Sequence, residues 1–369
     1  MSKRRKKKLN RRQQEIRRKR LKKRKRRRAI VIIIELIILC ILGTTAFALF
    51  KLGKMERTSL TNIKNNGLKQ TGYTNIALFG LDSRGKSLGK GNRTDTIMVA
   101  SINNETKKVK LISVYRDTML KQNGEHYDKA NAAYSVGGPE MAVNMLNENL
   151  DLDIQDYVSV NFLALADVID MVDGITVKMT DEEVVHMNNY CVETSKVTGK
   201  KYKKIEPAVA GTYKLNGVQA VSYARIRYTA GGDYKRTERQ RLVLEKTANK
   251  LKKQNLATIN KIIDKVMPEV STSFSTKEIL ALASGVFDFE LGETSGFPFD
   301  LETPDSVPGY SGSYVIPKGL EENVIKLHEF LFPDEDYTPT ETVTNISDTL
   351  INMTNVYPST TGSGTSQDE

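Results

Sequence analysis

One uninterrupted apolar segment constrains this chain more than any other feature of its sequence. Residues 29–50 read AIVIIIELIILCILGTTAFALF and contain a single charged side chain, Glu35. As a helix they would extend about 33 Å, which matches the roughly 30 Å of a bilayer's hydrocarbon core. The segment is longer than the apolar part of a secretory signal, and no small-residue cleavage site follows it. We therefore predict one uncleaved transmembrane signal-anchor helix over residues 29–50.

A strongly basic tail precedes this segment and fixes the expected orientation. Residues 1–28 contain 19 Lys and Arg against one acid, Glu15, whereas the whole chain has a formal net charge of +12. The remainder of the chain is therefore net acidic. Because positive charge beside a transmembrane helix stays in the cytoplasm, the tail is expected inside and the domain outside the cell membrane. The tail is expected to contact anionic membrane lipid, and nucleic acid is not expected as a partner.

The part after the apolar segment has the pattern of an α/β domain. We predict a polar stalk over 51–72, a folded domain over 73–333 and a disordered Ser/Thr-rich tail over 334–369. Strand patterns alternate with amphipathic helical patterns, which indicates helices layered on a sheet. The predicted strands are 75–81, 96–102, 109–115, 157–161 and 175–179, and the predicted helices are 162–172, 217–224, roughly 234–253 and one that starts at Gly138-Pro139-Glu140. Cys191 is the only cysteine outside the apolar segment, so no intrachain disulfide is expected in this domain.

Charged residues gather where the first three predicted strands begin or end. They are Asp82, Arg84, Arg93, Asp95, Arg116 and Asp117. Strand ends are where α/β sheets carry their ligand sites. Carboxylates among arginines suggest Mg²⁺ beside phosphate, because Mg²⁺ prefers oxygen ligands and bridges to phosphate groups. The alternative is that Asp82 and Asp95 simply pair with Arg84 and Arg93.

A second basic cluster lies in YARIRYTAGGDYKRTERQ, residues 223–240. We expect Asp233 to cap a helix that places Arg236 in its first turn and Gln240 on the same face. Cations at a helix N-terminus are unfavourable unless an anion lies beside them, and the free N–H groups there also bind phosphate. If residues 225–227 are extended, Arg225 and Arg227 point to the same side. The alternative is a solvated, salt-bridged helix face.

These motifs together resemble the LytR-CpsA-Psr family over roughly residues 73–250. The motifs that carry the resemblance are GLDSR (80–84), RTDT (93–96), SVYRD (113–117), KANAAY (129–134) with Gly137-Gly138-Pro139, LNG…QA…YARIR (215–227) and Asp233…Arg236…Arg239-Gln240. They occur in the order and spacing of that family. The resemblance implies an α/β/α sandwich around a mixed central sheet, preceded by the membrane helix.

The resemblance also implies a role for each charged residue. The pyrophosphate of a lipid carrier would be bound by Arg93, Arg116, Arg225, Arg227, Arg236 and Gln240. Mg²⁺ would be held by Asp82 and Asp95, and the catalytic residues would be Asp95, Arg116 and Asp82. Further residues expected near the site are Arg84, Asp117 and Arg239. A polyprenyl carrier also requires an apolar channel, for which the predicted helix 162–172 is a candidate wall, although such a stripe is more often ordinary core.

The implied activity is a transferase reaction of the cell wall. Members of the family move an anionic glycopolymer, of teichoic acid or capsule type, from undecaprenyl pyrophosphate to peptidoglycan. A muramic acid 6-hydroxyl would attack the phosphorus that bears the polymer. The alternatives are a polyprenyl-pyrophosphate pyrophosphatase, a membrane-tethered transcriptional regulator whose tail binds DNA, and a carrier module without catalysis. The sequence contains no P-loop, G-x-S-x-G or H-E-x-x-H motif that would favour another chemistry.

Overall fold

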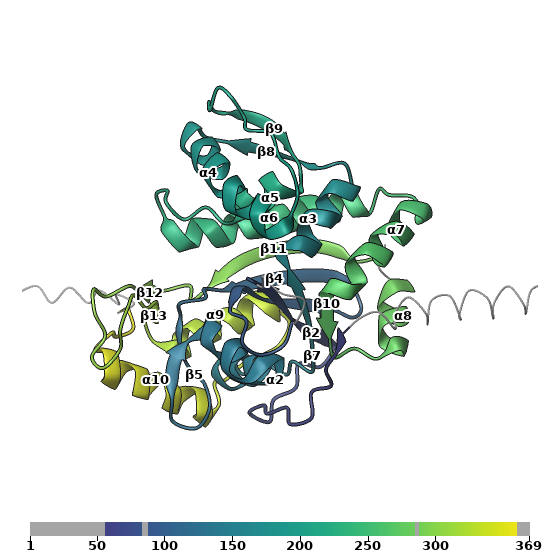
Figure 1. The fold of residues 1–369 in the computed structure, drawn as a ribbon. Helices are drawn as coiled ribbons and strands as arrows, with labels where there is room; N and C mark the ends of the chain where they lie inside the picture. The colour runs from purple at the N-terminus through teal and green to yellow at the C-terminus, as the bar shows by residue number, and fades with distance from the viewer. Residues whose placement is uncertain (1–55, 83–87, 285–287, 360–369) are drawn as a thin grey trace, which may run out of the picture. The chain divides into compact units, whose positions relative to one another are not determined.

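The computed structural model describes residues 56–82, 88–284 and 288–359, which form an α/β domain (Figure 1). Its centre is a mixed sheet of seven strands in the order β1-β10-β7-β2-β3-β4-β11. The antiparallel run β2-β3-β4 forms the middle, and β7 and β11 pair with it in parallel on its two sides. The strands are β1 (Glu56–Arg57), β2 (Tyr73–Leu81), β3 (Thr94–Asn103), β4 (Lys108–Val114), β7 (Asp156–Asn161), β10 (Val270–Thr272) and β11 (Glu290–Phe297). The expected α/β fold with a mixed central sheet is confirmed.

Strand β2 shows how the sequence separates the two faces of this sheet. Ala77, Phe79 and Leu81 are at most 1% exposed and belong to the main hydrophobic core. The intervening Leu78 and Gly80 line a cavity on the opposite face, because side chains alternate along a strand. One sequence pattern therefore builds a closed core on one side and a hollow on the other.

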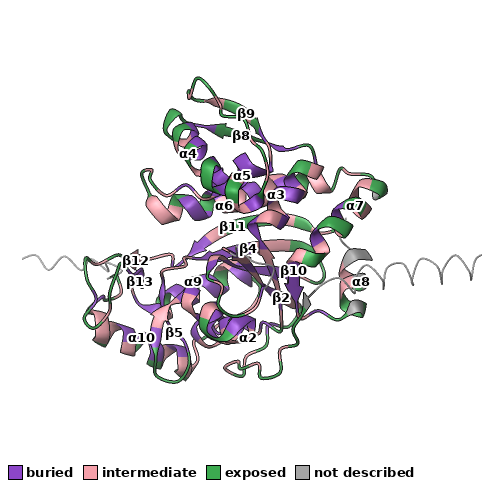
Figure 2. Cartoon of the chain, viewed as in Figure 1, coloured by how far each residue is buried: buried purple, intermediate pink, exposed green. Residues whose placement is uncertain are grey.

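Three helices cover the closed face. They are α2 (Ala130–Leu150), α9 (Leu320–Leu331) and α10 (Glu341–Thr354). Tyr134 of α2 packs edge-to-face on Phe79 with the ring centroids 5.1 Å apart, and its hydroxyl lies 2.9 Å from Ser159 Oγ of β7. Figure 2 shows buried and exposed residues alternating around these helices, as amphipathic packing requires.

The start of α2 differs from our expectation. We predicted that a helix begins at Gly138-Pro139-Glu140, but α2 begins at Ala130. Gly138 has φ 72° and breaks the helix, and Pro139 opens its second segment. The prediction is therefore correct for the second segment alone, because Gly138 and Pro139 interrupt a longer helix that starts at Ala130.

The other face of the sheet lies below α3 (Phe162–Met171), α5 (Gly217–Ala224) and α6 (Gly232–Leu251). Asn216 and Gln219 form the predicted capping box at the start of α5, which confirms that helix. Next to these helices pack α4 (Asp181–Thr198) and a small sheet of β8 (Ile175–Met179) and β9 (Gly211–Leu215). The predicted strand 175–179 is thus present, but it pairs with β9 and not with the central sheet.

The remaining elements complete the edges of the domain. They are β5 (Met119–Lys121), β6 (Tyr127–Lys129), α7 (Leu256–Val266), η1 (Met267–Glu269), α8 (Thr276–Ser284), β12 (Leu301–Glu302) and β13 (Ile316–Pro317). Residues 255–333 therefore supply two strands of the central sheet and one helix of the closed face.

Two predicted domain boundaries are wrong. Residues 56–72 are not a free stalk, because β1 pairs with β10 and the backbone N–H of Thr61 donates to Glu140 of α2. Residues 341–354 are not disordered, because they form α10 with Val343, Ile346 and Leu350 in the main core. The Ser/Thr/Asn-rich composition of the tail hid this helical spacing of apolar residues.

Asp151 connects segments from both ends of the described chain. It has a left-handed backbone, with φ 51°, at the end of α2. Its carboxylate accepts hydrogen bonds from Tyr337 Oη at 2.6 Å and from Thr340 Oγ1 at 2.7 Å. It also accepts one from Asn66 Nδ2. This single carboxylate therefore joins the segment before β2 to the segment that leads into α10.

The predicted basic tail, transmembrane helix and first stalk residues, 1–55, lie outside the described residues, as do residues 360–369 of the predicted tail. Among the described residues, no helix combines the length and the apolar character needed to cross a bilayer.

Candidate functional site

Five charged side chains from four distant segments meet at one end of the sheet. Arg116 follows β4, Asp95 lies in β3, Arg227 follows α5, and Asp233 and Arg236 lie in the first two turns of α6. Arg116 Nη1 lies 2.6 Å from Asp95 Oδ1, and Arg227 Nη2 lies 3.6 Å from the same oxygen. Asp233 Oδ1 lies 3.2 Å from Arg236 Nη1, 3.6 Å from Arg227 Nε and 3.8 Å from Arg116 Nε. We call these five residues the arginine cluster.

A β-bulge delivers Asp95 to this cluster. Gly80 of β2 pairs with Thr96 but Leu81 pairs with Thr94, so Asp95 is the extra residue of β3. A bulge re-aims the side chain it carries. Burial alone would raise the pKa of Asp95, but the guanidinium groups of Arg236, Arg116 and Arg227 outweigh it and hold the pKa below its usual value. Asp95 is therefore ionised at neutral pH.

Arg236 is the most enclosed cation of the cluster. Its side chain is 1% exposed, and burial lowers its pKa to about 10. Its Nη2 donates to the backbone oxygen of Asp95, but Nε and Nη1 have no hydrogen-bond partner among the described residues. Within the same residues, Arg116 Nε and both carboxylate oxygens of Asp233 also lack one, although ion-pair distances link them. Buried donors without acceptors are costly, so the cluster has capacity for additional acceptor atoms.

The start of α6 corrects one expectation. The N-cap is Gly231, with φ 88°, and not Asp233, whose side chain makes no capping hydrogen bond. Asp233 instead faces the guanidinium groups, because the double glycine starts the helix earlier than the sequence suggested. Its spacing of three residues from Arg236 was the available signal for this pair.

Arg225 does not join the arginine cluster. Residue 225 is helical and ends α5, so Arg225 and Arg227 do not leave an extended segment together. Arg225 Nη2 lies 3.0 Å from Glu193 Oε2, and its guanidinium lies over the rings of Phe162 and Tyr190. The expectation that places Arg225 and Arg227 on one side is therefore wrong.

Asp117 and Arg239, which were also predicted near the site, occupy two different positions. Asp117 lies 3.3 Å from Arg116 Nε and 3.1 Å from Lys129 Nζ, so it borders the cluster. Arg239 is buried away from it and pins the loop before α6 through Glu183, Thr229 and the carbonyl of residue 226. Lys129 was not among the predicted site residues, although its motif KANAAY was recognised.

The first predicted cluster is only partly assembled. Arg93 is exposed, and its carbonyl accepts a hydrogen bond from the backbone N–H of Asp82 at 3.2 Å. That bond brings the backbone of Asp82 next to the strand that carries Asp95. Arg84 lies outside the described residues.

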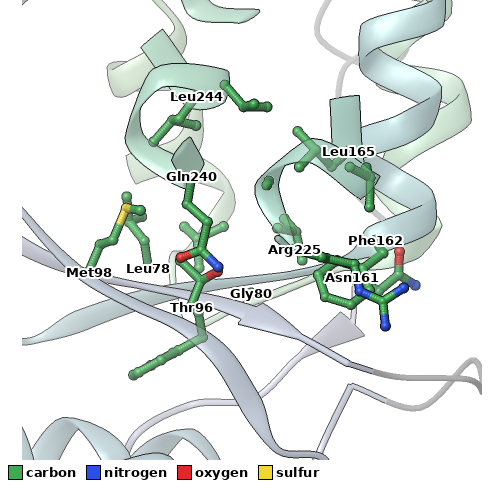
Figure 3. Close-up of a pocket in the computed structure, with 16 residues that line it drawn as sticks. Leu78, Gly80, Thr96, Met98, Asn161, Phe162, Leu165, Arg225, Gln240 and Leu244 are labelled. Carbon is green, nitrogen blue, oxygen red and sulfur yellow. The ribbon is translucent and has the colours of Figure 1, made fainter. Parts of the chain in front are cut away.

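An apolar cavity of about 260 Å³ opens beside the arginine cluster (Figure 3). Its floor is the open face of the sheet, and its walls come from α3, α5 and α6; lining residues include Leu78, Met98, Val160, Phe162, Leu165, Val221, Val243 and Leu244. Gln240 also lines the cavity, and its Nε2 lies 3.4 Å from the backbone oxygen of Asp95. Figure 3 shows this amide reaching from α6 down toward Thr96. The apolar cavity and the charged cluster therefore share a boundary at Gln240.

Asp95 and Asp82 are the two predicted ligands of a hard cation. Asp95 is ionised, and Asp82 follows the last residue of the neighbouring strand, β2. No group of three acidic, histidine or cysteine side chains suited to a metal occurs within 56–82, 88–284 and 288–359. Mg²⁺ commonly uses one or two carboxylates and completes its shell with water and phosphate oxygens. Asp82 and Asp95 are therefore the residues that would hold such an ion.

The sequence pattern of the LytR_cpsA_psr family matches residues 44–293. The chain belongs to the LytR-CpsA-Psr family. It is 31% identical over 254 residues to Biofilm regulatory protein A of Streptococcus mutans, a match that covers 65% of this chain and 60% of that protein. It is 29% identical over 255 residues to polyisoprenyl-teichoic acid–peptidoglycan teichoic acid transferase TagU of Enterococcus faecalis, covering 67% of this chain and 78% of that protein.

Solved structures of the family share the fold. A Bacillus subtilis TagT structure with bound octaprenyl pyrophosphate lipid superposes with a TM-score of 0.53 at 21% identity, covering 74% of this chain and 99% of that one. At this identity the similarity establishes the fold. The range matched by the family model includes the arginine cluster, the cavity and the central sheet as far as the start of β11, whereas α9 and α10 lie beyond residue 293.

Proposed function

We propose that this protein transfers a glycopolymer from a polyprenyl pyrophosphate carrier to the cell wall. The observation that carries the proposal is the shared boundary between an apolar cavity and three clustered guanidinium groups. Arg236 is buried, and donors of Arg236 and Arg116 have no hydrogen-bond partner among the described residues. A prenyl chain needs an apolar enclosure, and a pyrophosphate needs several fixed cations. TagU is named for this class of reaction, and TagT was solved with a lipid of this class.

The roles of the residues follow from their positions. Arg116, Arg227 and Arg236 would bind the pyrophosphate, because their donors converge and Arg binds phosphate oxygens through two N–H groups at once. Gln240 would contact the lipid phosphate where the cavity begins. Arg225 would border the entry of the prenyl chain, since it lines the cavity and lies apart from the cluster.

The reaction is a displacement at phosphorus. The 6-hydroxyl oxygen of a muramic acid residue in peptidoglycan attacks the phosphorus that bears the polymer, and the bond from that phosphorus to polyprenyl phosphate breaks. The new phosphodiester joins polymer to glycan, and the hydroxyl proton is released. Preorganised guanidinium groups stabilise the charge that spreads over the equatorial oxygens. Bound Mg²⁺, held by Asp82 and Asp95, would neutralise further phosphate charge.

Asp95 is better suited to charge balance than to proton abstraction. Its lowered pKa makes it a weak base, and Arg116 already donates to its Oδ1 at 2.6 Å. General bases work best with a pKa near the operating pH. Asp95 would therefore hold Arg116 and a cation in place, and its role would be electrostatic.

The cellular setting belongs to the same proposal. With the segment 29–50 as a membrane anchor, the domain would face outward, where peptidoglycan and the outer-leaflet lipid carrier are accessible. A donor of teichoic acid or capsule type fits this setting, and undecaprenyl pyrophosphate is the expected carrier.

A transfer assay tests the proposal and its rivals together. Purified full-length protein is given a synthetic polyprenyl-pyrophosphate-linked donor with and without peptidoglycan oligomers. Wild type should form the linked product, and Arg116→Ala and Asp95→Ala should lower the rate by at least about 100-fold, as the loss of transition-state charge partners does. Undiminished product from both variants would refute the site. Phosphate release at the same rate with and without peptidoglycan oligomers would instead support a pyrophosphatase. Salt-sensitive DNA binding without any turnover would support a regulator.

A further inference from the structure

Three aromatic rings form an open surface next to the arginine cluster. Tyr228 follows Arg227 directly in the chain, and its side chain is 73% exposed. The ring of Tyr190 on α4 lies nearly parallel to it, with centroids 6.5 Å apart and an interplanar angle of 20°. His186, one turn earlier on α4, lies 6.2 Å from Tyr228 at 36°. We call these three residues the aromatic platform.

Packing of the fold does not account for this platform. Aromatic side chains stabilise a fold by burying large apolar surfaces. Tyr134 and Tyr157 do so and are fully buried, whereas Tyr228 leaves most of its ring in contact with water. The ring of Tyr228 is stacked on Tyr190, and most of its side chain remains exposed. Tyr is enriched at binding surfaces, because its ring is apolar on the faces and its hydroxyl forms hydrogen bonds.

The platform is connected to both parts of the candidate site. The guanidinium of Arg225 lies 5.7 Å from the centroid of the Tyr190 ring and 5.2 Å from that of Phe162, and Arg225 and Phe162 both line the apolar cavity. On the other side, Arg227 lies 3.6 Å from the carboxylates of Asp95 and Asp233. Tyr228 follows Arg227 directly in the chain, and the charges of Arg227 and Arg236 act on the Tyr190 hydroxyl, whose pKa is raised chiefly by burial.

We propose that the aromatic platform is a subsite for a pyranose ring of the glycan substrate; this rests on the proposed function. The C–H bonds on one face of a pyranose carry partial positive charge, and the face of an aromatic ring carries partial negative charge. Two sources have this chemistry: the first sugar attached to the donor pyrophosphate and a sugar of the acceptor strand.

Binding measurements on the full chain in detergent separate these sources. The probes are octaprenyl pyrophosphate, the same lipid with N-acetylglucosamine on the pyrophosphate, and a soluble peptidoglycan tetrasaccharide. Tyr228→Ala should weaken binding of the sugar-bearing lipid or of the tetrasaccharide about two- to twelvefold, because a ring stack contributes about 0.5–1.5 kcal/mol. Binding of octaprenyl pyrophosphate without sugar should not change. Loss confined to the sugar-bearing lipid would identify a donor subsite, and loss confined to the tetrasaccharide an acceptor subsite.

Two further variants keep the test specific. Tyr228→Phe should bind like wild type, because it retains the ring and loses only the hydroxyl. Tyr357→Ala serves as the matched control, since Tyr357 is 63% exposed and lies beyond the end of α10. Unchanged binding of all probes by Tyr228→Ala, or an equal loss for the sugar-free lipid, would overturn the platform while leaving the proposed function in place. Failure of wild type to bind either lipid would overturn both.

Discussion

Asp233 provides the sharpest test of how the arginine cluster is balanced. Three guanidinium groups lie 3.2, 3.6 and 3.8 Å from its Oδ1, yet neither carboxylate oxygen has a hydrogen-bond partner among the described residues. The contribution of Asp233 is therefore its charge. Asp95 lies within 4 Å of Arg116 and Arg227, and Asp117 lies 3.3 Å from Arg116 Nε, whereas Asp233 lies within 4 Å of all three cations. Asp233→Asn keeps the size of the side chain and removes this shared compensating charge.

The magnitude follows from these distances. At an effective dielectric constant of 20, unit charges 3.6 Å apart attract by roughly 5 kcal/mol, most of which is offset by desolvation. Removing one partner of a buried pair costs about 3–5 kcal/mol. Because the side chain of Asp233 is 19% exposed, we expect Asp233→Asn to lower the free energy of unfolding by about 3 kcal/mol, the lower end of that range. The freed cations should bind inorganic pyrophosphate about tenfold more tightly, a change of about 1.4 kcal/mol.

Urea unfolding and calorimetric titration with inorganic pyrophosphate measure the two effects. The variant should be less stable than wild type without ligand and should recover more stability when pyrophosphate is added. Asp173→Asn is the matched control, since Asp173 forms an exposed ion pair with Lys214 and should leave both measurements unchanged. If Asp233→Asn is as stable as wild type, or binds pyrophosphate more weakly, then Asp233 does not compensate the positive charge of the cluster.

Two further predictions concern the closed face of the sheet. Leu350→Ala in α10 should lower the free energy of unfolding by about 2–5 kcal/mol in urea, because this side chain is 1% exposed in the main core; a loss below about 1 kcal/mol would remove α10 from that core. Burial lowers the pKa of His328 below its usual 6.5, so near that pH the unfolded chain takes up a proton that the folded chain does not. Stability should therefore fall as the pH drops below about 6.5, and His328→Gln should flatten that dependence between pH 7.5 and 5.5. An equally steep decline in the variant would exclude His328 as its source.

Local patterns in the sequence determined much of the fold. The strands that became β2, β3, β4 and β7 have clear apolar alternation, and the capping box of Asn216 and Gln219 identified α5. The strand ends carrying Asp95 and Arg116 could also be found, because charge after an apolar run is visible without a structure. That these ends meet the start of α6 was suggested only by the family resemblance.

The errors have one common cause, which is that local signals compete with tertiary contacts. Helix α10 was hidden because its apolar residues are spaced among Ser, Thr and Asn, and packing on α2 and α9 decides its structure. Asp233 is a residue type that often caps helices, but here its carboxylate faces three guanidinium groups and Gly231 is the N-cap. The separation of Arg225 from Arg227 depends on one helical residue at the end of α5, which the sequence does not specify.

The hydrogen bonds of Asp151 make the two ends of the domain mechanically interdependent. The same carboxylate accepts hydrogen bonds from Asn66, between β1 and β2, and from Tyr337 and Thr340, just before α10. Opening of either segment leaves the other with a weakened anchor, so the two should detach as one cooperative unit and share one hydrogen-exchange free energy. A force applied to the chain at β1 would therefore be resisted by α10 as well as by β10, the strand that pairs with β1.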